Sequence, residues 1–168
     1  MTTRVLVLSD THLILGARLP DAVLQLADRA DHILHAGDLI RVDVIDTLAA
    51  LAPITAVTGN VDDAEVAARL PVRCEVDLAG IRFGVLHDAG PEGGRHDRLA
   101  AQFLGCDVIV YGHTHIPELA GGDDGRPLIV NPGSPTQRRR APWHSVAWLE
   151  IEAEQIESAA LIQLDDDA

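Results

Sequence analysis

Six short apolar runs, each ending at a polar residue that can bind a metal or position a substrate, constrain this chain more than any other feature. The runs are VLVLSDTH, HILHAGD, ITAVTGN, FGVLHD, VIVYGHTH and LIVNPGS. Short runs rich in Val, Ile and Leu predict buried strands. Because sites in open α/β sheets form at the carboxyl ends of strands, we expect these polar residues to converge on one crevice.

Segments with helical periodicity lie between the runs, over about residues 20–29, 42–51 and 96–103. This alternation predicts an α/β fold. From Gly80 onwards the helical signal thins, and turn-prone stretches such as GGDDG predict more antiparallel pairing. We therefore expect two sheets packed face to face with helices outside, in a single domain over residues 1–163 followed by an acidic, flexible tail at 164–168.

The formal net charge of −13 argues against a protein that grips long nucleic acid, which needs a broad basic surface. The chain begins MTTRVLVLSDTH and runs directly into a strand-like segment, without the apolar stretch and cleavage site of a secretory signal. No segment approaches the length of a membrane span. We expect a cytoplasmic protein with no membrane partner; its oligomeric state, a homo-oligomer included, is left open.

Seven side chains at the ends of the runs are candidate metal ligands: Asp10, His12, Asp38, Asn60, His87, His113 and His115. Oxygen and imidazole donors suit Mn, Fe, Co, Ni or Zn. Seven donors exceed the three of a mononuclear catalytic zinc site, so two ions sharing a bridging carboxylate are the simpler account. His113 and His115 would face opposite sides of a regular strand, so both can bind only if the chain turns there.

The order Asp10-x-His12, Gly37-Asp38, Gly59-Asn60, His87 and Gly112-His113-Thr114-His115 resembles the motifs of the calcineurin-like metallophosphoesterase superfamily. The short length and the Gly59-Asn60-Val61-Asp62 form resemble its compact bacterial and archaeal phosphodiesterase branch, over Val5 to about Arg140. The resemblance implies two mixed β-sheets packed as a sandwich flanked by helices, with both metals at one edge. It also implies that Asp10, His12 and His115 hold one ion, that Asn60, His87 and His113 hold the other, and that Asp38 bridges them.

The activity implied is hydrolysis of a small phosphate ester, in particular a phosphodiester, by attack of a water that bridges two ions such as manganese or nickel. Asn60, Asp62 and His87 are the catalytic candidates. Many larger family members have His, acting on the leaving group, where this chain has Val61. Asp62, Asp88 or His96 could supply that proton instead, or a metal-bound water could suffice.

Asp88, His96, Ser134 and Arg138 are candidates for binding the substrate. Asp88 replaces the Gly that commonly follows the motif His in the compact branch, and could support the ligands or add charge. Ser134 ends Asn131-Pro132-Gly133-Ser134, which is similar to the closing motif of the family, whose loop lies beside the site. Arg138 opens a run of three arginines that could bind phosphate, although an exposed basic turn is at least as good an interpretation.

Two other functions stay open. The chain could be a non-catalytic metal-binding scaffold for protein–protein contacts, as some relatives of this family are, although such relatives tend to lose ligands that this sequence retains. It could also be a nuclease that acts on nucleotides or short nucleic acid. His35 is interpreted as a strand-end histidine with a satisfied hydrogen bond.

Overall fold

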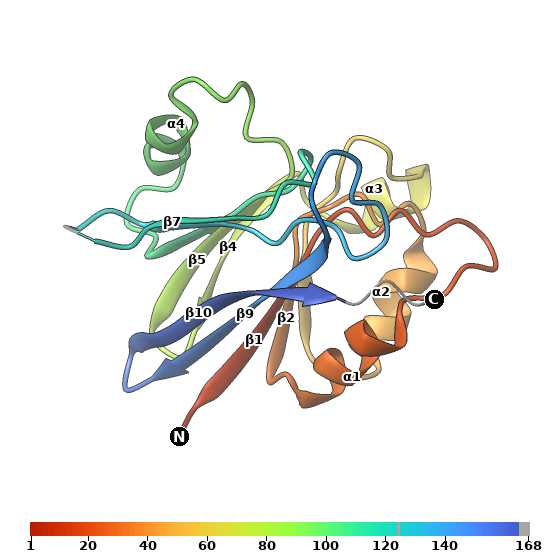
Figure 1. Ribbon diagram of the computed structural model, residues 1–168, viewed down its shortest axis with the longest axis horizontal. Helices are drawn as coiled ribbons and strands as arrows, with labels where there is room; N and C mark the ends of the chain where they lie inside the picture. Colours follow the sequence, from red (N-terminus) through yellow and green to blue (C-terminus); the bar gives the residue numbers. More distant parts are fainter. Residues whose placement is uncertain (124, 165–168) are drawn as a thin grey trace.

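Two five-stranded sheets face each other in the computed structural model, which describes residues 1–123 and 125–164 (Figure 1). The first sheet has the order β10-β9-β1-β2-β3 and is built from β10 (Gln155–Leu164), β9 (His144–Glu152), β1 (Thr3–Leu8), β2 (His32–His35) and β3 (Ile54–Ala56). The second has the order β4-β5-β6-β8-β7 and is built from β4 (Arg73–Leu78), β5 (Ile81–Leu86), β6 (Val108–Val110), β8 (Leu128–Asn131) and β7 (Glu118–Gly121).

Both sheets are mixed, as the resemblance implied. In the first sheet β1, β2 and β3 run parallel, while β9 is antiparallel to β1 and to β10. In the second sheet β5, β6 and β8 run parallel, and the edge strands β4 and β7 are antiparallel to their neighbours. The parallel strands end at the same edge, which is where the candidate ligands follow them.

Alternation along each buried strand divides the core into layers. In β1, Val5 and Val7 pack in the cluster between the two sheets, while Leu6 and Leu8 pack against helices. Helices α1 (Asp21–Arg29), α2 (Val42–Ala49) and α3 (Ala64–Arg69) contribute to the cluster on the outer face of the first sheet. Helix α4 (Arg95–Gln102) covers the second sheet through Leu99 (Figure 1). The result is the expected sandwich flanked by helices.

Several elements were not predicted. Strands β4, β7 and β10 all lie at sheet edges and contain few buried residues, and α3 has only six residues. The α3 helix begins after Asp63, whose carboxylate accepts hydrogen bonds from the Glu65 and Val66 amides.

Leu164, which the sequence analysis assigned to the tail, is buried and pairs with His144 at the end of β10. The rest of that predicted tail, residues 165–168, lies outside the described residues. None of the helices in the described residues has the length and apolar character needed to cross a membrane.

Candidate metal centre

The candidate ligands come together where five strands end. Asp10 and His12 follow β1, Asp38 follows β2, Asn60 follows β3, His87 follows β5, and His113 and His115 follow β6. Donor atoms of Asp10, His12 and His115 lie within 4.8 Å of one another, and so do those of Asp10, Asp38 and His87.

Asn60 and His113 complete the cluster on the His87 side. The Asn60 Oδ1 atom lies 3.0 Å from His87 Nε2 and 2.9 Å from His113 Nδ1. Asp38 Oδ2 lies 3.2 Å from His87 Nε2 and 3.5 Å from His12 Nε2. Asp38 is therefore the carboxylate between the two groups of ligands, while its other oxygen accepts a hydrogen bond from the Val61 amide.

Sharp turns after the strands aim these side chains into one place. Asp10, His12, Asp38, His113 and His115 all have φ between 43° and 69°, in the left-handed region. Such a conformation costs on the order of 1–3 kcal/mol per residue and clusters at functional sites, although Asp and His tolerate it better than most residues. The turn that both His113 and His115 require in order to bind is therefore present.

Glycines let the ligand loops approach one another. A Cβ atom at Gly112 would overlap Ser9 Oγ and lie 2.8 Å from Asp10 Oδ2, and a Cβ atom at Gly59 would overlap the Asp38 carboxylate. A Cβ atom at Gly37, where φ is 89°, would lie 2.8 Å from Gly59 N and 3.0 Å from His87 Cβ. Only the absence of a side chain at these positions allows the loops to pack this tightly.

Backbone carbonyls fix the orientation of two histidines among the candidate ligands. His87 Nδ1 donates to the Ala36 carbonyl at 2.7 Å, and His115 Nδ1 donates to the Gln137 carbonyl. In the neutral ring the Nε2 lone pair then faces carboxylate oxygen: Asp38 Oδ2 for His87, and Asp10 Oδ1 at 3.2 Å for His115. Acceptors that face one another need a proton or a metal cation between them.

The same need is visible at Asp10. Its Oδ1 is the one buried side-chain nitrogen or oxygen atom in the described part of the chain that has no hydrogen-bond partner. Its Oδ2 accepts from Ser9 Oγ at 2.7 Å and from the His113 amide at 2.9 Å. A buried carboxylate oxygen without a donor, aimed at imidazole lone pairs, fits a divalent metal ligand.

Ionisation at the site follows from the same contacts. Burial would raise the pKa of Asp10 and of Asp38, but His115 and His12 beside Asp10, and His87 beside Asp38, outweigh it and hold both pKa values below the usual range. Burial opposes a charge on His87, yet the Asp38 carboxylate raises the pKa of this histidine above its ordinary value. The contact with Asp38 therefore favours the protonated form of His87 more than water does.

Asp62 lies behind the ligand loops and ties them together. Its carboxylate accepts hydrogen bonds from the Gly59 amide at 2.6 Å, the Ile40 amide at 2.6 Å and the Asp38 amide at 3.2 Å. These contacts join the loop that carries Asp38 to the loop that carries Asn60. The catalytic role considered for Asp62 stays a prediction, and its observed contacts are those of a positioning residue.

His35 also links two ligand loops, as a buried histidine with satisfied hydrogen bonds. The Gly37 amide donates to its Nδ1 at 3.2 Å, so its Nε2 donates to Thr11 Oγ1 at 3.2 Å. Complete burial lowers the pKa of His35 to about 3, against the smaller opposite effect of Asp10. His35 is therefore neutral. No local sequence pattern indicates this link, because the bond to Thr11 spans 24 residues.

The four predicted substrate-binding residues have different surroundings. Ser134 is buried, and its hydroxyl donates to the Asp10 carbonyl at 2.7 Å and accepts from the Gln137 amide at 2.9 Å. Exposed Asp88 accepts from the Gly90 amide at 2.8 Å, His96 Nε2 lies 2.9 Å from Glu118, and Arg138 donates to the Pro142 carbonyl at 3.1 Å. Substrate contact by these four residues stays a prediction.

Two mixed sheets in a sandwich, with Asp, His and Asn donors gathered at the strand ends, define the class of the metallophosphoesterases. The chain belongs to the calcineurin-like phosphoesterase superfamily, whose domain model matches residues 3–154. A Methanocaldococcus jannaschii protein described as a probable metallophosphoesterase is 39% identical over 87% of this chain and 74% of its own length. The family implies divalent metal ions and a hydrolase that acts on phosphoesters.

Solved structures agree on the fold. The solution structure of a Thermotoga maritima protein is 29% identical, with a TM-score of 0.74 over 96% of this chain and 99% of that one. Entamoeba histolytica Vps29 complexed with zinc is 23% identical, with a TM-score of 0.75 over 97% of this chain and 99% of that one. A structure described as a novel archaeal phosphodiesterase is 21% identical, with a TM-score of 0.71 over 96% and 100% of the two chains. The last two likenesses support the fold alone.

Proposed function

We propose that this protein is a phosphodiesterase that hydrolyses a small phosphate diester with two divalent ions, manganese foremost among Mn, Ni, Fe, Co and Zn. The observation that carries the proposal is the buried Asp10 Oδ1, which accepts no hydrogen bond from the described residues and faces His115 Nε2 at 3.2 Å. The contact between this carboxylate oxygen and the imidazole nitrogen is unfavourable when both are acceptors, and a bound cation would make it favourable.

In the proposed centre Asp10, His12 and His115 hold one ion, Asn60, His87 and His113 hold the other, and Asp38 is shared. When bound, two such ions lower the pKa of a water between them and offset the charge that builds on a phosphoryl group. The position of Asp38 supports its shared role, because its Oδ2 lies within 3.5 Å of ring nitrogens on both sides.

The protein's own contribution is to orient the donors and to handle the leaving group. Asp62, His35 and Ser134 hold the ligand loops through backbone contacts. Asp88 lines the same pocket as Asn60 and His87, whereas His96 lines a different one. Asp88 is therefore our candidate for the residue that protonates the leaving group.

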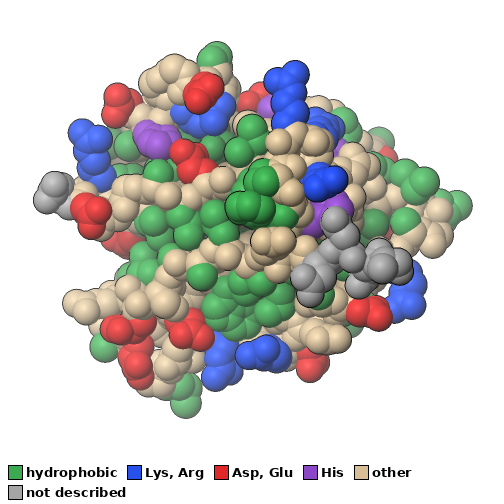
Figure 2. All heavy atoms as spheres, in the orientation of Figure 1, with side chains coloured by type: hydrophobic (Ala, Val, Ile, Leu, Met, Phe, Trp, Pro, Cys, Tyr) green, Lys and Arg blue, Asp and Glu red, His purple; other side chains and the backbone are tan. Residues whose placement is uncertain are grey.

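A small substrate is favoured over a long nucleic acid. The formal charge is −13, and the face seen in Figure 2 intersperses acidic and basic side chains without a continuous basic surface. Nucleotides and short nucleic acid ends remain compatible with this surface. The cytoplasmic location expected from the sequence stays a prediction.

Hydrolysis of bis(4-nitrophenyl) phosphate by the manganese-loaded protein tests the proposal. We expect turnover that chelation abolishes and that Asp38→Ala lowers by at least a hundredfold, since Asp38 serves both ligand groups. Asp28→Ala, which removes an exposed carboxylate on α1, is the matched control and should leave turnover unchanged. Full turnover by metal-free protein would refute the proposal.

A scaffold role is the second candidate, because the fold is shared with Vps29. The complete set of donors favours catalysis over this role. Absence of turnover across a broad panel of phosphate monoesters and diesters, together with a stable protein partner recovered on the intact chain, would reverse the preference.

A further inference from the structure

We infer that the pocket beside Asn60 and His87 binds a flat aromatic ester group of the substrate; this inference rests on the proposed function. The pocket has a volume of about 390 Å³ and shares Asn60 and His87 with the metal centre. That volume lies in the range of small-molecule sites. A phosphate held at the metal centre would direct one of its ester groups into this space.

The wall of the pocket is apolar because of how three segments meet. Leu86 ends β5 directly before His87, and Val72 directly precedes β4. Leu86 pairs with Arg73 across the β4–β5 ladder, and the Thr58 amide donates to the Pro71 carbonyl at 2.9 Å. These contacts fix the wall against the ligand loop.

Val72 is an exposed apolar residue in the lining of this pocket. Its side chain is 74% exposed although it stands on the wall of a concave site. Single exposed apolar residues are ordinary. An apolar wall that continues into a cluster of buried polar side chains is typical of a small-molecule binding pocket. In the inferred complex this apolar surface receives the ester group of the substrate.

The pocket also has polar groups, which favour a heteroaromatic ring over an alkyl chain as the bound group. Gln102 offers both a donor and an acceptor, and Arg73 offers donors. A heteroaromatic ring such as a nucleobase can place its face on the apolar wall and its edge against these groups, and the Arg73 guanidinium can stack on it. An alkyl group could use only the apolar wall.

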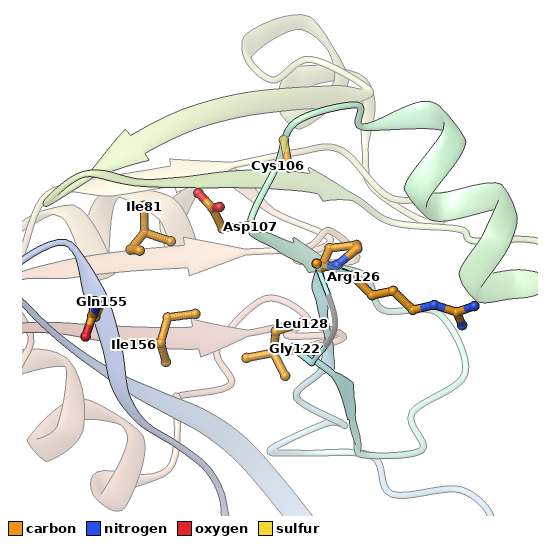
Figure 3. Close-up of a pocket in the computed structure, with 10 residues that line it drawn as sticks. Ile81, Cys106, Asp107, Gly122, Arg126, Leu128, Gln155 and Ile156 are labelled. Atoms are coloured by element: carbon orange, nitrogen blue, oxygen red, sulfur yellow. The ribbon is translucent and has the colours of Figure 1, made fainter.

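A second cavity of similar volume, also about 390 Å³, does not have this relation to the chemistry (Figure 3). Its lining includes Ile81, Asp107, Leu128 and Ile156, and none of the seven ligand candidates. Of these two cavities, only the pocket beside Asn60 and His87 combines an apolar wall with residues of the candidate metal centre.

Binding of phenylphosphonate and methylphosphonate to the zinc-loaded protein, measured by calorimetry, tests the inference. Both probes carry the same non-hydrolysable phosphonate, so their difference reports the ester-group pocket. Burial of roughly 50 Å² more apolar surface predicts about eightfold tighter binding of phenylphosphonate. Amide NMR signals of Val72, Leu86 and Gln102 should shift with phenylphosphonate and not with methylphosphonate.

Val72→Ser should reduce the preference to about twofold to threefold, since it removes part of the wall at an exposed position. Leu15→Ser, at another exposed apolar residue outside the pocket, is the control and should keep the full preference. Equal binding of both phosphonates with diester hydrolysis intact would overturn the pocket assignment alone. Failure of both to bind, with no hydrolysis, would overturn the proposed function and this inference with it.

Discussion

Asp62→Asn is expected to destabilise the protein and to weaken metal binding together, because this carboxylate ties two ligand loops. One oxygen accepts from the Gly59 and Asp38 amides, and the other accepts from the Ile40 amide at 2.6 Å. An amide side chain has a single acceptor oxygen. If that oxygen keeps the first two bonds, the new NH₂ group faces the Ile40 amide, donor against donor.

The loss can be sized from the bonds. A hydrogen bond to a charged group contributes about 1.5–3 kcal/mol, so Asp62→Asn should lower the free energy of unfolding by about 2 kcal/mol. Asp62→Ala leaves three amides without their acceptor and should cost about 4 kcal/mol, reduced where water replaces the carboxylate. Metal affinity should fall about tenfold or more, as it does when groups that orient ligands are removed.

Urea unfolding of the metal-free protein and competition with a chromophoric chelator measure the two quantities. Asp28→Asn, at an exposed position on α1, is the matched control. If Asp62 acted instead as the proton donor, Asp62→Asn would lower kcat while stability and metal affinity stayed at wild-type values. That result would refute the positioning role.

Three further predictions concern other parts of the molecule. Tyr111 is the only tyrosine, and its hydroxyl donates a hydrogen bond to the Glu118 carboxylate at 2.5 Å. Burial and this contact with Glu118 raise the pKa of Tyr111 to about 12. The contribution of Tyr111 to stability is thus complete below pH about 10 and is lost as pH rises towards 12. Titration of the tyrosinate absorbance should have its midpoint near pH 12, and Glu118→Gln should lower that midpoint. A midpoint near pH 10 would contradict the contact with Glu118. Gly112→Ala should cost about 1–3 kcal/mol and weaken metal binding, while Gly93→Ala, which meets no atom within 4 Å, should do neither; equal behaviour of the two variants would be evidence against close approach of the loops. Metal affinity should fall as pH drops, with the loss beginning above the ordinary histidine pKa of about 6.5, because the pKa of His87 is raised and ligation needs the neutral ring. Constant affinity down to pH 5 would exclude histidine ligation.

The sequence predicted the parts of the fold that continuous apolar runs specify. Strand β1, for example, is buried on both faces over Val5 to Leu8, and its short run of Val and Leu followed by polar residues predicts a buried strand. Strand β4 reads RCEVDL and alternates between exposed and half-buried residues at a sheet edge, which gives a weak signal in a single sequence. Helix α3 had a usable signal that was not read, since Asp63 is a favourable N-cap residue.

The candidate ligands could be predicted because each follows a recognisable strand, and their order matches the family's motifs. The residues that orient them could not. Asp62 reaches Ile40 across 22 residues and His35 reaches Thr11 across 24, and neither pairing leaves a local pattern in the sequence. The left-handed backbone of Asp10 and His12 was equally hidden, because Asp and His are compatible with many conformations.

A crystal structure of the manganese-loaded protein, with anomalous scattering recorded for the metal, tests the proposed two-metal centre most directly. Two anomalous peaks are expected at the strand ends, roughly 3.5–4 Å apart, with the Asp38 carboxylate between them. A single peak without Asp38 as a ligand, or no peak among Asp10, His87 and His115, would contradict it.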